Sequence, residues 1–194
     1  MAVSHESSAW RSWQAAALDD GIDHLIRQIY ARLDEEVRRR GPVCWTSGRC
    51  CQFDAYGHRL YVTGLEIAWV WAQLNRGHCE IRRQQEGSTH RSEFRLALPV
   101  WNSNSDEPTD GCPFQVDRLC SIHTVRPLGC RIFFCQDGTA QWQNILYEQF
   151  LQELRTLHDT HGLVYQYMEW RSGLRQAKRW LTSDHGGEQT PLPL

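Results

Sequence analysis

Seven of the eight cysteines in this chain of 194 residues fall into two groups, separated by a long stretch of other sequence. These seven are Cys44, Cys50 and Cys51 in the first group, and Cys112, Cys120, Cys130 and Cys135 in the second. Clustered thiols in a reducing compartment are typical of metal ligands or redox groups. Residues such as Thr46, Pro113 and Gly129 indicate irregular backbone around both groups, and loops can wrap sulfur atoms around a metal. The seven cysteines are therefore predicted to be metal ligands.

The spacing of these cysteines bears on the kind of metal. Structural zinc usually takes four ligands from paired C-x2-C knuckles, and this sequence has none. A cubane iron-sulfur cluster also takes four thiolates, often unevenly spaced, and a shell of aromatic residues would keep it dry. The aromatic residues next to the cysteines are Trp45, Phe53, Phe114, Phe133 and Phe134. The pattern favours a 4Fe-4S cluster, with zinc as the alternative.

Two cysteines have special positions within this pattern. Cys50 and Cys51 are adjacent, so their Cα atoms lie about 3.8 Å apart, which is closer than in ordinary disulfides. We expect one of them to ligate the centre while the other packs, binds a second metal or serves as a reactive thiol. Cys79 stands apart from both groups and is expected to be a buried structural residue.

The two cysteine groups resemble the signature of the YkgJ-type cysteine-cluster family of zinc- or iron-chelating proteins. That signature pairs a cysteine and a later CC doublet with a CPF...CSI..-RP..CR.F element. The matching segments here are Cys44 to Cys51, Cys112-Pro113-Phe114, Cys120-Ser121-Ile122, Arg126-Pro127 and Cys130-Arg131-Ile132-Phe133. The resemblance covers roughly residues 44 to 135. It implies metal chelation. In the hypothesis of a metal-binding module, Cys51, Cys112, Cys120 and Cys130 are the foremost ligands, with Cys44, Cys50 and Cys135 in support.

Three functions are compatible with such a centre. The first is a metal-binding module. The second is an enzyme, because flagellin lysine N-methylases carry a similar cysteine cluster, although no separate site for a methyl donor is evident in the sequence. The third is an adaptor in which zinc clamps the two loops and the helices bind a protein partner. A centre with no pocket beside it would favour the adaptor over the enzyme.

Three side chains near the second group could modify its chemistry. His123 follows Cys120 closely enough to complete a mixed site, but an exposed loop histidine without metal is the favoured interpretation. Arg126 and Arg131 flank Cys130 and could donate hydrogen bonds to sulfur. Capping of loops through backbone carbonyls is an equal alternative for both arginines.

Helical periodicity predicts the elements that position the cysteines. Apolar residues with helical spacing occur in residues 19–40, with Ile22, Leu25, Ile26, Ile29, Leu33 and Val37, and in residues 140–161, with Trp142, Ile145, Leu146, Phe150, Leu154 and Leu157. Gly41-Pro42 should end the first helix. Thr63 to Glu66 has the form of a capping box and predicts a helix start there, and a further helix is expected over residues 164–181.

The remaining sequence predicts one short strand over residues 94–100 and a loop over residues 101–111. These elements together indicate a mainly α fold, a single helical domain over residues 1–182 with irregular cysteine-rich loops and at most a short β element. Its cysteine core spans residues 44–135, and residues 183–194 are expected to form a disordered tail.

The composition of the chain bears on which partners the protein can bind and where in the cell it is expected. There are 21 basic and 23 acidic residues, and a net charge of -2 provides no field to hold nucleic acid or an anionic membrane. Four basic residues on the last predicted helix, Arg171, Arg175, Lys178 and Arg179, are expected to form a solvated face. No apolar segment is long enough for a signal peptide or a membrane span, so a cytoplasmic protein is expected.

Overall fold

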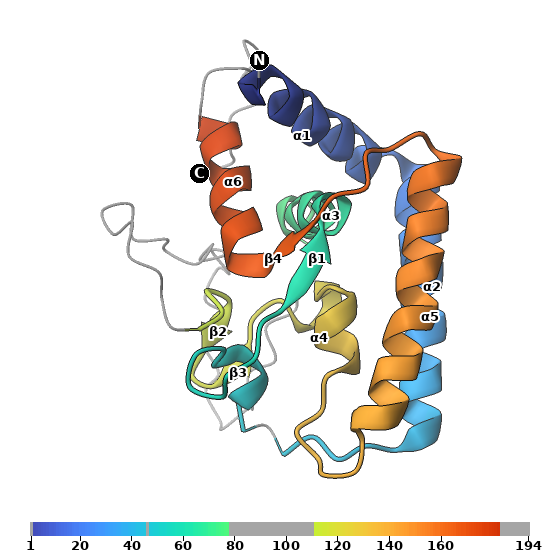
Figure 1. Ribbon diagram of the computed structural model, residues 1–194, viewed down its shortest axis with the longest axis vertical. Coiled ribbons are helices and arrows are strands. Elements are labelled where there is room, and N and C mark those ends of the chain that lie inside the picture. Colours follow the sequence, from blue (N-terminus) through green and yellow to red (C-terminus); the bar gives the residue numbers. More distant parts are fainter. Residues whose placement is uncertain (1, 46, 78–110, 183–194) are drawn as a thin grey trace, which may run out of the picture.

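The computed structural model describes residues 2–45, 47–77 and 111–182, and it confirms a mainly α fold with only short strands. Figure 1 shows α2 and α5 lying side by side, with α3 near the middle of the molecule and the hairpin β2-β3 at one end. The elements are α1 (Ala2–Leu18), α2 (Asp20–Arg40), η1 (Arg49–Cys51), β1 (Tyr61–Thr63), α3 (Gly64–Asn75), β2 (Gln115–Val116), β3 (Leu119–Cys120), η2 (His123–Val125), α4 (Leu128–Ile132), α5 (Ala140–Thr160), β4 (Tyr167–Glu169) and α6 (Trp170–Thr182).

The two long helices α2 and α5 confirm the predictions from periodicity, with one exposed position in each. Leu25 on α2 and Ile145 on α5 were expected on the buried stripes, but both are exposed. Tyr30 occupies the buried face of α2 instead. Gly41 ends α2 in the left-handed conformation, where its N–H donates to the carbonyls of Arg38 and Val37. Amphipathic spacing thus predicted the two helices correctly. It did not predict which residues at the edges of each apolar stripe are buried.

The start of α3 is a complete capping box. The Thr63 hydroxyl accepts a hydrogen bond from the Glu66 N–H at 3.2 Å, and the Glu66 carboxylate accepts one from the Thr63 N–H at 2.8 Å. The helix is buried almost all round, and α1, which periodicity did not predict, packs against it. Gly64 permits this contact, since a Cβ there would lie 2.4 Å from the ring of Trp13. The N-terminal helix therefore completes the core around α3.

The C-terminal segment differs from the prediction of one helix over residues 164–181. Residues Tyr167–Glu169 form β4, which pairs antiparallel with β1 and places Val62 opposite Met168. The helix α6 begins only at Trp170, whose N–H donates to the carbonyl of Leu60. Pairing with β1 satisfies backbone groups that a first helical turn would leave open, so the tertiary contact overrides the local helical pattern.

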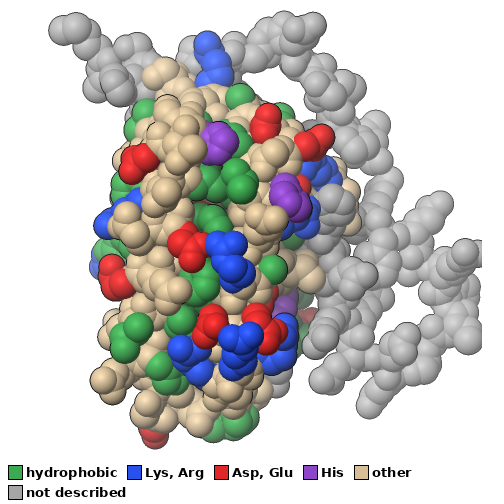
Figure 2. Space-filling view, turned by 90° about the vertical axis from the view of Figure 1, so that its right-hand side faces the viewer, with side chains coloured by type: hydrophobic (Ala, Val, Ile, Leu, Met, Phe, Trp, Pro, Cys, Tyr) green, Lys and Arg blue, Asp and Glu red, His purple; other side chains and the backbone are tan. Residues whose placement is uncertain are grey.

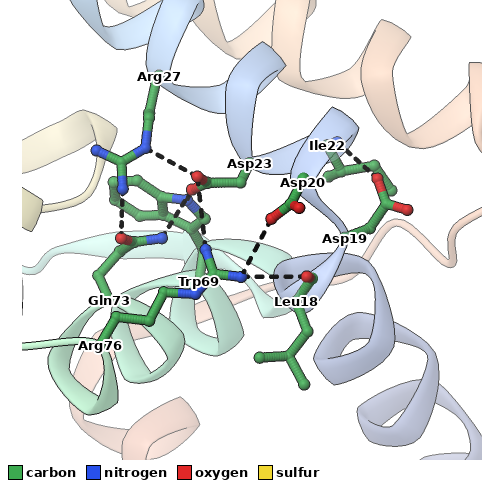
Figure 3. Close-up of polar contacts among 9 residues, drawn as sticks. All are labelled: Leu18, Asp19, Asp20, Ile22, Asp23, Arg27, Trp69, Gln73 and Arg76. Carbon is green, nitrogen blue, oxygen red and sulfur yellow. Dashed lines mark hydrogen bonds and ion pairs between the residues drawn. The ribbon is translucent and has the colours of Figure 1, made fainter.

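A polar network around Asp23 joins α2 to α3 (Figure 3). One carboxylate oxygen of Asp23 accepts hydrogen bonds from Trp69 Nε1 at 2.6 Å and Gln73 Nε2 at 2.7 Å, and the other accepts one from Arg27. The guanidinium of Arg76 forms an ion pair with the same carboxylate. Burial raises the pKa of Asp23, but these hydrogen bonds and positive charges outweigh it and hold the pKa below its usual value of 3.8.

We expect the substitution Asp23→Asn to lower the free energy of unfolding by about 1–3 kcal/mol at neutral pH, because hydrogen bonds and ion pairs to a charged acceptor are lost or weakened. A carboxyl group with a depressed pKa stabilises the fold above its unfolded pKa, and this contribution disappears as the pH falls through the folded value. The difference between the two proteins should therefore narrow in acid. Urea unfolding at about pH 7, 5 and 3 checks this expectation, and a difference that stays constant would contradict it.

Several predictions fall on residues outside the described ranges. These are the strand over residues 94–100, the loop over residues 101–111 apart from Gly111, the structural role of Cys79, and the tail over residues 183–194. Among the described residues, no helix has the length and apolar character needed to cross a membrane.

Charged side chains of both signs lie intermixed on the face formed by α2 and α5 (Figure 2). At the end of α2, Glu35 and Glu36 form ion pairs with Arg39, and Glu36 also pairs with Arg40. Because acidic and basic side chains alternate here, this face has no extended region of positive or negative electrostatic potential. On α6, Arg171 is also paired, with Asp54 and Glu169.

Candidate metal centre

The cysteines lie on four short segments that meet at one end of the molecule. Cys50 and Cys51 belong to the turn η1, Cys120 to the strand β3 and Cys130 to the helix α4, while Cys112 lies three residues before the start of β2. The prediction that all of them lie in irregular loops is therefore only partly correct. Each element is so short that its cysteine still stands near a chain reversal.

Direct backbone contact joins the two cysteine groups. The Cys112 N–H donates to the Cys51 carbonyl at 2.7 Å. Gly111 permits this approach, because a Cβ there would lie 2.7 Å from that carbonyl oxygen. The side chain of Gln115 reaches back to donate to the carbonyl of Gly48 at 2.8 Å. The loop that carries the first group is thus held against the segment that carries the second.

The hairpin β2-β3 places Cys120 opposite Gln115. Its two-residue turn consists of Asp117 and Arg118, both with positive φ. This conformation matches the twist of a tight antiparallel hairpin, although Asn-Gly is the usual sequence for it. The absence of glycine at these positions explains why periodicity and turn signals did not reveal the hairpin.

Four thiols interact at the centre of this arrangement. The Cys51 side chain interacts with the thiols of Cys50, Cys112 and Cys120, and the sulfur atoms of Cys50 and Cys51 lie 4.0 Å apart. Cys130 interacts electrostatically with Cys112, Cys120 and Cys50. The structure thus brings together the four foremost predicted ligands and adds Cys50.

The thiols change one another's acidity. Hydrogen bonding with its three thiol neighbours raises the pKa of Cys51, and burial raises the pKa of Cys130 well above its usual value. The hydrogen bond from Cys51, opposed by burial and aided by the charge of Arg126, lowers the pKa of Cys50 to about 6. A separate hydrogen bond, between Cys51 and Cys120, is the main cause that lowers the pKa of Cys120. Without a bound cation, repulsion between neighbouring thiolates allows only a few of these sulfur atoms to be deprotonated at the same time.

Cys44 and Cys135 lie at the edge of the group. Cys44 is exposed, and Cys135 interacts electrostatically with Cys50 and Cys44. The loops that carry these two residues are joined by a hydrogen bond of 2.8 Å from the Val43 N–H to the side chain of Gln136. Both cysteines are therefore near the centre but outside the four interacting thiols.

The two flanking arginines have different roles. Arg131 is buried and donates to the carbonyls of Arg126 and Thr124 and to the carboxylate of Asp34, so it follows the backbone-capping alternative. Arg126 has a positive charge that lowers the pKa of Cys50 and Cys120, and its Nε is buried without a hydrogen-bond partner among the described residues. His123 is exposed, as expected.

A buried carboxylate that sequence analysis assigned only to helix capping also holds the segment of Cys130. One oxygen of Glu66, which is 2% exposed, accepts hydrogen bonds from the N–H of Leu128 and from the Tyr30 hydroxyl, both at 2.9 Å. Leu128 is the first residue of α4, and the guanidinium of Arg131 lies 4.3 Å from the ring centre of Tyr30. The capping motif was visible in the sequence, whereas its contact with α4 was not.

A cavity of about 310 Å³ opens beside the cysteines, and Cys50 and Cys130 form part of its wall. Half of the twelve other lining residues carry rings: Phe53, His58, Tyr61, Phe133, Tyr147 and Tyr167. The imidazole of His58 stacks on Phe133 with ring centres 4.9 Å apart. The candidate centre is therefore accessible from a pocket.

In the described part of the chain, no group of three or more His, Cys, Asp or Glu side chains is placed so that it could hold a metal ion. Ligation by these cysteines would therefore require some of their side chains to change rotamer. Their donor chemistry nevertheless suits a soft metal or an iron-sulfur cluster.

No protein-family model matches this chain, and comparisons with curated proteins and with solved structures give no match.

Proposed function

We propose that the protein holds a metal centre, with Cys51, Cys112, Cys120 and Cys130 as its foremost ligands and Cys50, Cys44 and Cys135 close to it. The observation that carries this proposal is the approach of four separate cysteine-bearing segments, which are joined by the hydrogen bond from the Cys112 N–H to the Cys51 carbonyl and by interactions among their thiols. Cysteines that only fill a core have no physical reason to gather in this way. The similarity to the YkgJ-type signature supports the same proposal.

The charges around the thiols agree with a centre of this kind. A metal or cluster neutralises thiolates that otherwise repel one another, and ligation requires the deprotonated form. A cluster held by four thiolates is anionic overall, so it would provide the acceptor that the buried Nε of Arg126 lacks within the described residues. These features support both an iron-sulfur cluster and zinc.

We favour a 4Fe-4S cluster over zinc. The sequence contains no C-x2-C knuckle, and the cysteines lie among aromatic side chains, including the buried Phe53 and Phe114, that limit access of water to part of the centre. When bound, such a cluster would supply one-electron chemistry. A cytoplasmic location, where the thiols stay reduced, is part of this proposal.

The cavity beside Cys50 and Cys130 bears on the choice between an enzyme and an adaptor. A centre with a purely clamping role needs no access from a pocket. The cavity therefore supports a centre that meets a small molecule, and a relative of the cluster-containing lysine methylases is one form of that proposal. The adaptor in which zinc only clamps the loops is the alternative.

Protein purified without oxygen is expected to be brown, with about four iron and four sulfide per chain, as for one cubane cluster. Elemental analysis and the visible absorption spectrum of the anaerobic protein measure this directly. A colourless protein with stoichiometric zinc would exclude the cluster and leave the adaptor as the better proposal.

A further inference from the structure

The cavity beside the cysteines has a wall composition that indicates the chemistry of its ligand. Six of its lining residues carry rings, and two pairs of them are stacked. His58 lies against Phe133, and Tyr61 lies against Tyr167 with ring centres 5.5 Å apart and planes 19° from parallel. Flat rings are the groups that pack best against such surfaces. At about 310 Å³, the cavity has room for a small molecule.

Charge is distributed unevenly around this cavity. Arg59 is exposed and lines it, and none of the described lining residues is Asp or Glu. Asp54 interacts electrostatically with Arg59, but its carboxylate accepts two hydrogen bonds from Arg171, at 2.8 Å and 3.2 Å. Arg59 is thus the group on the wall that suits an anion.

The other parts of the wall disfavour an anion. The hydroxyls of Tyr147 and Tyr167 hydrogen-bond each other, and burial, with the negative charge of Glu66 among the further causes, raises the pKa of both. The wall formed by Cys50 and Cys130 would adjoin an anionic centre. A bound molecule should therefore turn its charged group toward Arg59 and its ring toward the tyrosines and the cysteines.

We infer that this cavity binds a small flat aromatic carboxylate, with the ring against the stacked side chains and the carboxylate paired with Arg59. The placement of the ring beside a metal centre rests on the proposed function, whereas the ring and charge preferences rest on the cavity alone. The ligand would thus be an aromatic acid that approaches the centre by its ring.

Calorimetric titration of the full chain with three matched compounds tests the inference. Naphthoate has both the flat ring and the charge, naphthamide has the ring without the charge, and decahydronaphthoate has the charge without the flat ring. We expect naphthoate to bind with a Kd below about 1 mM and about three- to tenfold more tightly than either comparator. Absence of saturable binding, or equal binding of all three compounds, would overturn the inference.

Two substitutions separate the contributions of charge and ring. Arg59→Gln should weaken naphthoate about three- to tenfold and leave naphthamide unchanged, whereas Tyr61→Leu should weaken both. The matched controls are Arg38→Gln and Tyr56→Leu, which alter exposed residues that do not line the cavity. Equal effects of Arg59→Gln and Arg38→Gln would show that naphthoate binds elsewhere and would overturn the assignment.

Metal analysis of the same samples distinguishes failure of this inference from failure of the proposed function. If the purified protein contains no metal and naphthoate still binds in a manner that depends on Arg59, the result supports ligand binding in the cavity and refutes the metal centre. If the protein holds an iron-sulfur cluster, naphthoate should shift the visible absorption of that cluster, because the ring would lie against Cys50 and Cys130. Binding without any such shift would overturn the placement of the ring.

Discussion

Replacing Cys120 or Cys130 with serine is expected to lower metal content and thermal stability together. Cys120 lies on β3 and Cys130 on α4, and both interact with cysteines of other segments, so the centre joins parts of the chain that are far apart in sequence. Metal bound across these segments closes long loops, and its binding free energy becomes folding free energy. We expect Tm to fall by about 10 °C or more, since each kcal/mol corresponds to about 2–4 °C for a chain of this size.

The control for these two variants is Cys79→Ser, which removes the cysteine that stands apart from both groups in the sequence. It should change neither the metal content nor the melting temperature by much. One melting curve and one metal assay for each variant make the comparison. Loss of metal from Cys79→Ser, with metal retained in Cys120→Ser, would show that the ligands are assigned incorrectly.

Removal of the Glu66 carboxylate should have the second large effect. In Glu66→Ala, the buried donors Thr63 N–H, Leu128 N–H and Tyr30 hydroxyl all lose their acceptor. Each unsatisfied buried donor is costly, and we expect the free energy of unfolding to fall by about 3–5 kcal/mol. Urea unfolding of both proteins at neutral pH measures the difference.

The same variant should also release metal faster to a chelator, because Glu66 holds the first residue of the helix that carries Cys130. Glu66→Gln keeps the shape and one acceptor oxygen, so it should lose only about 1–2 kcal/mol. Asp23→Asn is the second control, since it weakens the contact between α2 and α3 and the partners of Asp23 in that network are neither cysteines nor residues of α4. If all three variants release metal equally fast, general instability and not the position of α4 controls the centre.

Short-range patterns in the sequence were sufficient to predict most of the helical framework. The apolar spacing within residues 19–40 and 140–161 predicted α2 and α5, and Gly41 and the capping box at Thr63 marked a helix end and a helix start correctly. These signals can be detected in the sequence because each depends on residues three or four positions apart. The grouping of the cysteines could also be detected, because their density within short stretches of the sequence is high.

Contacts between distant segments were not accessible in this way. Pairing with β1 turned residues 167–169 into a strand, and a hairpin without glycine placed Cys120 beside the first group of cysteines. Arg126 and Arg131 have similar positions around Cys130 in the sequence, yet Arg131 caps carbonyls while Arg126 lies near the thiols. Such differences depend on which side of a packed segment each residue faces.

The amino-acid sequence by itself therefore determined the main helices, their caps and the set of thiols available for a centre. Only the tertiary structure decided that Cys51 meets Cys112 and Cys120, that Glu66 anchors α4 and that an aromatic cavity opens beside Cys50 and Cys130. The physical reason is the range of the interactions. Helix formation and capping depend on neighbouring residues, whereas these contacts exist only once packing of the core has brought distant segments together.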